Sequence, residues 1–179
     1  MCIRDSYTGS RLSADIDAAL GRRMLLPDDL QVTYKAEDGK HHTLYFDRQY
    51  NDTLGLMHEG AHADSVSIDV PGVNPKRLDV RVLSAVDLAV SKLARCADPD
   101  REDIKALARA GLLDSGKLRQ RAEQALGGYI GRVSDVRDSI DLACRMIDEI
   151  TTGSGHPPRT RAKPGKARDP SRTRPRRRG

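Results

Sequence analysis

The chain has 179 residues and a formal net charge of +5, with 32% charged and only 3% aromatic residues. At 37% hydrophobic content, this length allows one domain with an aliphatic core and excludes two large domains. The sequence contains neither a signal peptide nor an apolar run long enough to span a membrane. It therefore predicts a cytoplasmic protein with no membrane partner.

The first six residues, Met-Cys-Ile-Arg-Asp-Ser, resemble a peptide translated from sequencing-adaptor DNA at the edge of a metagenomic assembly. We therefore expect residues 1–6 to be an artefactual leader and the natural N-terminus to be missing. Segments of this kind are excluded from fold reasoning, as fusion scars are. The interpretable chain then begins at residue 7.

The segment that follows alternates between strand-like runs and turn signals. An Asp38-Gly39 dipeptide between two such runs predicts a β-hairpin. Between the hairpin and the later strands we expect a short helix over residues 51–59. The strands are expected at residues 13–18, 30–36, 41–46, 65–70 and 77–83.

From Ser84 onward the sequence pattern is helical. Ser84-x-x-Asp87 is a capping box, which predicts a helix from Ala85 to Cys96. Asp98-Pro99 opens a second helix that is expected to run to about Arg109 and to stop at Gly111.

Two further helices complete this part of the chain. Ser115 is expected to cap the third, which ends at Gly127-Gly128. The fourth is indicated by apolar residues at three- and four-residue steps, which are Val133, Val136, Ile140, Ala143, Ile147 and Ile150. The order of elements predicts an α/β (α+β) fold, in which a small mixed β-sheet over residues 7–83 precedes a C-terminal helical bundle over residues 84–152.

The C-terminal segment differs sharply from the rest in charge. Residues 156–179 hold ten Lys or Arg and one acid, Asp169, so they carry +9 and the other 155 residues carry −4. A segment rich in Pro, Gly and Arg has too few apolar side chains to form a core. We expect residues 153–179 to be a disordered basic tail. It is either a weakly selected extension or a polycation that binds RNA phosphates without reading sequence.

Asp15-Ile16-Asp17 is the motif that points to chemistry. Residues two apart in a strand share a face, so both carboxylates would project side by side. Mg²⁺ takes oxygen ligands and usually binds through one or two carboxylates plus the phosphates of a substrate. The pair therefore indicates Mg²⁺-dependent nucleotide chemistry, whereas Asp-x-Asp on a solvated loop is the plainer interpretation.

Further motifs follow in a characteristic order. Asp87-Leu-Ala-Val-Ser-Lys92-Leu-Ala-Arg95 is followed by Asp100-Arg-Glu-Asp103-Ile. Together with Arg-Leu-Ser-Ala-Asp15-Ile-Asp17, these residues resemble the minimal nucleotidyltransferase superfamily over roughly residues 7–150. The branch that they resemble includes abortive-infection toxins and uncharacterised bacterial nucleotidyltransferases.

The resemblance implies a nucleoside triphosphate (NTP) substrate and metal held by Asp15 and Asp17. A third carboxylate is normally required, and our choice is Asp47, at the end of a predicted strand, as metal ligand or proton acceptor. The competing candidates are Asp52, Asp69 and Asp79.

The helical part of such a site would contact the nucleotide. Lys92 and Arg95 are the candidates to neutralise its phosphates, with Asp103 nearby. Each has a plainer interpretation: Asp87 is sufficiently explained as a helix cap, Lys92 as a solvated lysine, and Asp100 and Asp103 as acids that favour a helix N-terminus.

One element departs from the superfamily pattern. The phosphate-binding Gly-Gly or Gly-Ser pair normally precedes Asp-x-Asp by some ten residues, whereas Gly9-Ser10 lies six residues before Asp15. Ser10 is our candidate for this role in the chain. We expect that the true pair was lost with the missing N-terminus and that Gly9-Ser10 is a loop.

His58-Glu59-Gly60-Ala61-His62 satisfies the His-Glu-x-x-His pattern of zinc hydrolases. Gly60 would weaken the required helix in its middle, and no third histidine follows at the metzincin spacing. A surface loop is the favoured interpretation.

Three functions from different classes remain open. The first is nucleotide transfer from an NTP to a hydroxyl of RNA, protein or a small molecule, as the toxin of a toxin-antitoxin pair or a phage-defence component. The second is a catalytically inactive binding module with the same fold, and the third is the zinc hydrolase. An RNA acceptor bound through the tail and a cognate antitoxin are the expected macromolecular partners.

Overall fold

The computed structural model describes residues 15–21, 25, 27, 30–35, 39–47, 55–70 and 72–153, with the backbone alone for residues 15–17. The expected leader, Ser10, Asp52 and the basic tail from residue 154 onward lie outside the described residues.

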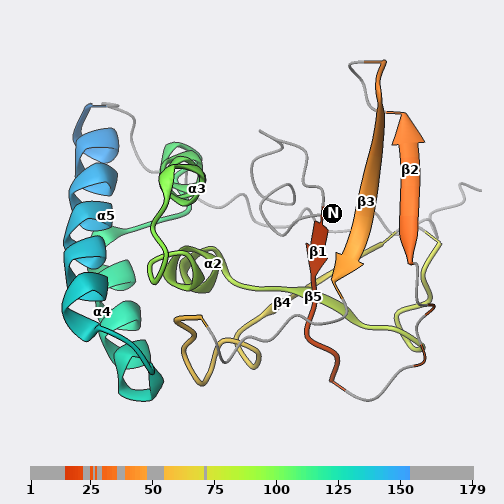
Figure 1. Ribbon diagram of the computed structural model, residues 1–179, viewed down its shortest axis with the longest axis horizontal. Helices are drawn as coiled ribbons and strands as arrows, with labels where there is room; N and C mark the ends of the chain where they lie inside the picture. Colours follow the sequence, from red (N-terminus) through yellow and green to blue (C-terminus); the bar gives the residue numbers. More distant parts are fainter. Residues whose placement is uncertain are drawn as a thin grey trace, which may run out of the picture.

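Three strands form a mixed sheet in the order β1-β3-β2, where β1 spans Asp15–Asp17, β2 spans Gln31–Lys35 and β3 spans His41–Asp47. β2 and β3 pair antiparallel, so the predicted hairpin is confirmed, and Gly39 takes the φ of 79° that its turn requires. β1 pairs with β3 in parallel, and Figure 1 shows both arrows pointing the same way. β3 is therefore the central strand.

Two further strands, β4 (Val66–Ile68) and β5 (Val80–Val82), pair with each other in a separate antiparallel sheet. The prediction of strands in these two segments is confirmed, although both are shorter than expected. The expected helix over residues 51–59 is wrong in the part that the structure describes, because residues 55–59 are not helical. Glu59 and Gly60 instead begin a turn that continues to Asp64.

The helical part consists of α2 (Ala85–Ser91), α3 (Asp98–Arg109), α4 (Ser115–Ala125), the short 3₁₀ helix η2 (Leu126–Gly128) and α5 (Val133–Gly153). Ser84 caps α2 as predicted, since its Oγ accepts the Asp87 N–H at 3.1 Å. α2 ends at Ser91 rather than at the expected Cys96, because the chain turns there and Cys96 takes a left-handed φ of 46°. α4 is capped by Asp114 and not by Ser115, since the Asp114 carboxylate accepts the Lys117 N–H at 2.8 Å.

The end of α3 follows from one glycine. Gly111 has a φ of 70°, and the Leu112 N–H donates to the Leu107 carbonyl at 3.0 Å while the Gly111 N–H donates to Ala108 at 2.9 Å. These two bonds form a Schellman motif, which satisfies carbonyls that the helix leaves open. The predicted stop at Gly111 is confirmed.

The hydrophobic core lies among the helices, which Figure 1 shows at one side of the molecule. The four middle positions predicted for the last helix, Val136, Ile140, Ala143 and Ile147, are all buried, whereas Val133 and Ile150 are partly buried. Leu56, which precedes the turn, also belongs to this core. The mixed α+β fold with a helical C-terminal part is therefore confirmed. Among the described residues, no helix has the length and apolar character that a membrane span needs.

Candidate active site

The pairing of β1 with β3 determines where the predicted metal ligands lie. Asp17 stands opposite Asp47, and Asp15 stands opposite Tyr45. Residues two apart in a strand share a face, and so do residues opposite each other in adjacent strands. Positions 15, 17 and 47 therefore lie on one face of the sheet. Asp17 and Asp47 are the last residues of their two parallel strands.

The face that carries these positions is the open one. On β3, three of the four positions that share this face are exposed, namely His41, Tyr45 and Asp47. The three residues of β3 on the opposite face, His42, Leu44 and Phe46, are all half-buried. Asp47 is therefore exposed to solvent on this face.

The donor chemistry of these positions fits a hard divalent cation. All three residues supply carboxylate oxygens, which Mg²⁺ prefers as ligands. Among the side chains that the structure describes, no three His, Cys, Asp or Glu residues gather closely enough to hold a metal ion, and those of Asp15 and Asp17 are outside that set. The metal assignment thus depends on backbone register and ligand type.

Two competitors for the third carboxylate lie elsewhere. Asp69 is exposed just beyond the end of β4. Asp79 accepts hydrogen bonds from Ser67 and, at 3.3 Å, from Arg81. The pKa of Asp79 is lowered, and the hydrogen bond from Ser67 is the main cause. Both belong to the β4–β5 region, whereas Asp47 pairs directly with β1. Asp52, the other competitor, lies outside the described residues.

The residues predicted to contact phosphate form an ion-pair cluster between α2 and α3. Lys92 Nζ lies 2.9 Å from Asp103 Oδ2 and 3.8 Å from Asp100 Oδ1. Arg95 donates two hydrogen bonds of 2.7 Å to the two carboxylate oxygens of Asp100, which also accepts the Ala97 N–H at 3.0 Å. The structure therefore brings Lys92, Arg95 and Asp103 together and pairs both cations with carboxylates.

The surroundings of Asp100 favour its ionised form. Its side chain is 2% exposed, and burial alone would raise its pKa. The hydrogen bonds from Arg95 and Ala97 and the charges of Arg95 and Lys92 outweigh burial, so the pKa of Asp100 lies below its usual range. Asp100 is thus an ionised anchor for the N-terminus of α3 rather than only an acid placed near the helix dipole.

The two groups of predicted site residues lie in different parts of the molecule. Figure 1 shows the three-stranded sheet at one side, α2 and α3 towards the other, and β4 and β5 between them. The carboxylate positions of β1 and β3 are therefore brought together, whereas the Lys92 cluster is set apart from them. The role of Lys92 and Arg95 at a nucleotide phosphate stays a prediction.

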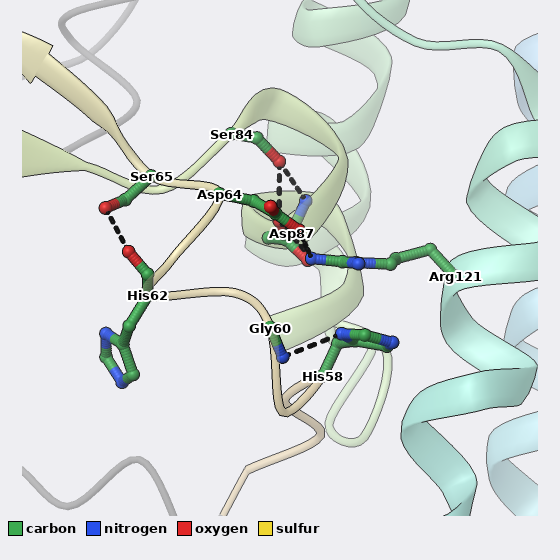
Figure 2. A network of polar contacts seen from close by, with 8 residues as sticks. All are labelled: His58, Gly60, His62, Asp64, Ser65, Ser84, Asp87 and Arg121. Atoms are coloured by element: carbon green, nitrogen blue, oxygen red, sulfur yellow. Dashed lines mark hydrogen bonds and ion pairs between the residues drawn. The ribbon is translucent and has the colours of Figure 1, made fainter.

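A second buried ion pair joins α2 to α4, and the sequence reasoning missed it. Figure 2 shows Arg121 reaching from α4 to Asp87, with Nε 2.7 Å from Asp87 Oδ1, and to Asp64 of the preceding turn, also at 2.7 Å. Asp87, only 1% exposed, also accepts a hydrogen bond from the Ser84 hydroxyl at 2.7 Å. Capping alone does not explain this burial, because a buried carboxylate requires a cationic partner. This requirement predicts a cationic partner for a buried Asp87, but it does not say which Lys or Arg of the sequence is that partner.

The His-Glu-x-x-His segment does not form the zinc-hydrolase geometry. Residues 59–62 belong to a turn rather than a helix, and the Gly60 N–H donates to His58 Nδ1 at 2.9 Å. Figure 2 shows the His58 and His62 side chains on different sides of this turn. The predicted surface-loop interpretation agrees with this conformation, because two ligands one helical turn apart require a helix.

Comparison with known proteins identifies the family. A family model described as "Nucleotidyltransferase of unknown function (DUF6036)" matches residues 7–134. The chain belongs to this nucleotidyltransferase family. The matched region includes β1, β3 and the Lys92 cluster and reaches the first residues of α5, so the resemblance read from Asp15-Ile16-Asp17 and the later motifs is confirmed at family level. No curated protein and no solved structure matches the chain.

Proposed function

We propose that this nucleotidyltransferase-family protein transfers a nucleotide from an NTP to a hydroxyl acceptor, with Asp15, Asp17 and Asp47 as its catalytic carboxylates. The observation that carries the proposal is the parallel register of β1 and β3, which sets Asp17 opposite Asp47 and Asp15 two residues away on the same face. Membership of the family supports the reaction class.

The reaction is an in-line displacement. The acceptor oxygen forms a bond to the α-phosphorus while the bond from that phosphorus to the pyrophosphate oxygen breaks. The hydroxyl proton passes to Asp47, and pyrophosphate leaves with the bonding electron pair. Asp15 and Asp17 would hold Mg²⁺, which supplies charge neutralisation at the triphosphate when it is bound.

The proposal includes three classes of hydroxyl acceptor, which are RNA, a protein and a small molecule. The basic tail favours an RNA acceptor, because ten cations in residues 156–179 bind phosphate backbones without choosing a sequence. A toxin or phage-defence role and a cognate antitoxin rest on the resemblance alone. The cytoplasmic location rests on the sequence, which shows no signal-peptide pattern and no apolar run of membrane-spanning length. The second candidate function is an inactive binding module of the same fold.

The test is label transfer from each of the four α-labelled NTPs to total RNA, with Mg²⁺ and the full chain. The double variant Asp15→Asn/Asp17→Asn should reduce incorporation by at least about a hundredfold, because it removes the anionic ligands of the metal. Chelation of Mg²⁺ should have the same effect on the wild-type protein. Asp138→Asn is a matched control on the exposed side of α5 and should leave incorporation unchanged.

The proposal fails if the double variant transfers label as fast as the wild-type chain. A wild-type chain that binds NTP and Mg²⁺ but labels no RNA, protein or small hydroxyl compound would support the inactive binding module instead.

A further inference from the structure

Tyr45 lies on the central strand β3, beside the proposed catalytic carboxylates. It stands opposite Asp15 of β1 on one side and opposite Gln31 of β2 on the other. It also lies two residues before Asp47 on the same strand, so all of these positions share the open face of the sheet. No other described aromatic residue pairs directly with β1 on this face.

The Tyr45 side chain is exposed in a protein with few aromatic residues. It is 53% exposed, whereas Tyr34 and Phe46, the other aromatic side chains of β2 and β3, are half-buried on the opposite face. Its paired neighbour Gln31 and its strand neighbour Asp47 are both polar and exposed. The ring is therefore not part of an apolar patch of the kind that marks a protein interface.

We propose that the Tyr45 ring is the platform on which the base of the NTP stacks. This inference rests on the proposed function, because it takes the triphosphate to be held at positions 15, 17 and 47. Two strand positions are separated by about 6.6 Å, which leaves room for the ribose between the α-phosphate and a base over position 45.

The commitment to a nucleobase follows from the neighbouring chemistry. Aromatic side chains stack on every base, because each base presents a π-face. The phosphates require a cation, which Asp17 and Asp47 would hold at the ends of their strands. The uncharged base suits the ring one step back along β3, in the row that Tyr45 shares with Asp15. Stacking of this kind tolerates all four bases, so Tyr45 is expected to strengthen binding without selecting one NTP.

The experiment measures binding and turnover in the full chain with Mg²⁺. Calorimetric titration with an α,β-methylene NTP, which resists transfer, should show about tenfold or greater weakening in Tyr45→Ala and wild-type affinity in Tyr45→Phe. With the cleavable NTP, Tyr45→Ala should raise KM by the same factor and leave kcat nearly unchanged. Inorganic tripolyphosphate, which has no base, should inhibit wild type and Tyr45→Ala equally.

A matched control tests whether the effect belongs to this face. Val32 is 57% exposed but lies on the opposite face, so Val32→Ala should bind the NTP analogue as the wild-type chain does. A Tyr45→Ala variant with wild-type affinity for the analogue would overturn the inference and leave the proposed function intact. A wild-type chain that binds no NTP would overturn both.

A third outcome distinguishes stacking from chemistry at the hydroxyl. If Tyr45→Phe is as defective as Tyr45→Ala, or if mass spectrometry finds a nucleotide attached to Tyr45, the hydroxyl rather than the ring carries the function, and the stacking role is wrong.

Discussion

The helical part and the three-stranded sheet of this molecule differ in what holds them together. Apart from Leu56, Ala61 and Val82, every described hydrophobic residue that is buried lies between Leu88 and Ile147. No described side chain of β2 or β3 is buried. Burial of apolar surface is the main stabilising contribution to folding, so stability resides in the helices while the proposed chemistry lies on the sheet.

Replacing one large apolar side chain by alanine in each part tests most directly whether stability resides in the helices. Ile140 is fully buried, so Ile140→Ala should lower the free energy of unfolding by about 2–5 kcal/mol through lost burial and a cavity. Val32→Ala on the sheet should change it by less than about 0.5 kcal/mol, because Val32 is 57% exposed. Urea unfolding followed by circular dichroism measures both, and equal losses would contradict the division.

The ion pair between α2 and α4 should contribute nearly as much as the core. Arg121→Ala leaves the Asp87 carboxylate buried without its charged partner and should lower the free energy of unfolding by about 3 kcal/mol. Asp64→Asn removes only the outer contact of the same arginine, to a side chain 58% exposed, and should reduce it by less than about 1 kcal/mol. Thermal melts of the two variants measure this difference, and similar melting temperatures would argue against the buried pair.

The pH dependence of stability should report on the cluster at the start of α3. The pKa of Asp100 is lower in the folded protein than its ordinary value in the unfolded chain, because of its hydrogen bonds from Arg95 and Ala97 and the nearby positive charges. Its ion pairs therefore stabilise the folded protein at all pH values above the pKa that Asp100 has in the unfolded chain. This contribution disappears as the pH falls through the lowered pKa of the folded protein. Urea unfolding at a series of acidic pH values should show this loss in the wild-type chain.

A variant without the Asp100 charge sharpens that measurement. Asp100→Asn should be less stable at neutral pH and should lose less stability on acidification than the wild-type chain. Asp98→Asn, at an 87% exposed side chain, should keep the wild-type slope. Identical slopes in all three proteins would show that Asp100 is not the group responsible.

Substitutions at two glycines should give the smallest change in the free energy of unfolding. Gly111 has a φ of 70° and no atom near an added Cβ, so Gly111→Ala should lower the free energy of unfolding by about 1 kcal/mol through backbone strain alone. Gly127 has equal space but no positive φ, so Gly127→Ala should be neutral or stabilising by about 0.5 kcal/mol. Chemical denaturation measures this difference, which a destabilised Gly127→Ala would contradict.

The helices could be predicted because their signals are local. Ser84 and Gly111 act on backbone groups within a few residues, and the apolar steps from Val136 to Ile147 define one face of one helix. The end of α2 at Ser91 could not be predicted, because no glycine or proline stands at or just after that position. The sequence pattern continued through Lys92 without a break.

Long-range pairing limited what the sequence could say about the site. The hairpin could be predicted from one turn, but the pairing of β1 with β3 spans the chain between residues 17 and 41 and carries no local signal. Asp87 and Arg121 lie far apart in sequence, so only the folded helices bring them together. Lys92 is the opposite case, because its carboxylate partners, Asp100 and Asp103, lie close to it in the sequence. Each of the three residues was interpreted separately, so their pairing was not predicted.

The parallel pairing of β1 also ties the proposed activity to strand alignment. β1 has three residues and lies at the edge of its sheet, so few backbone hydrogen bonds fix its position along β3. A slip by one residue would turn Asp15 and Asp17 to the other face together. We therefore expect heat to abolish the proposed nucleotide transfer before the helical signal melts, and the transfer to return on cooling as the strand realigns.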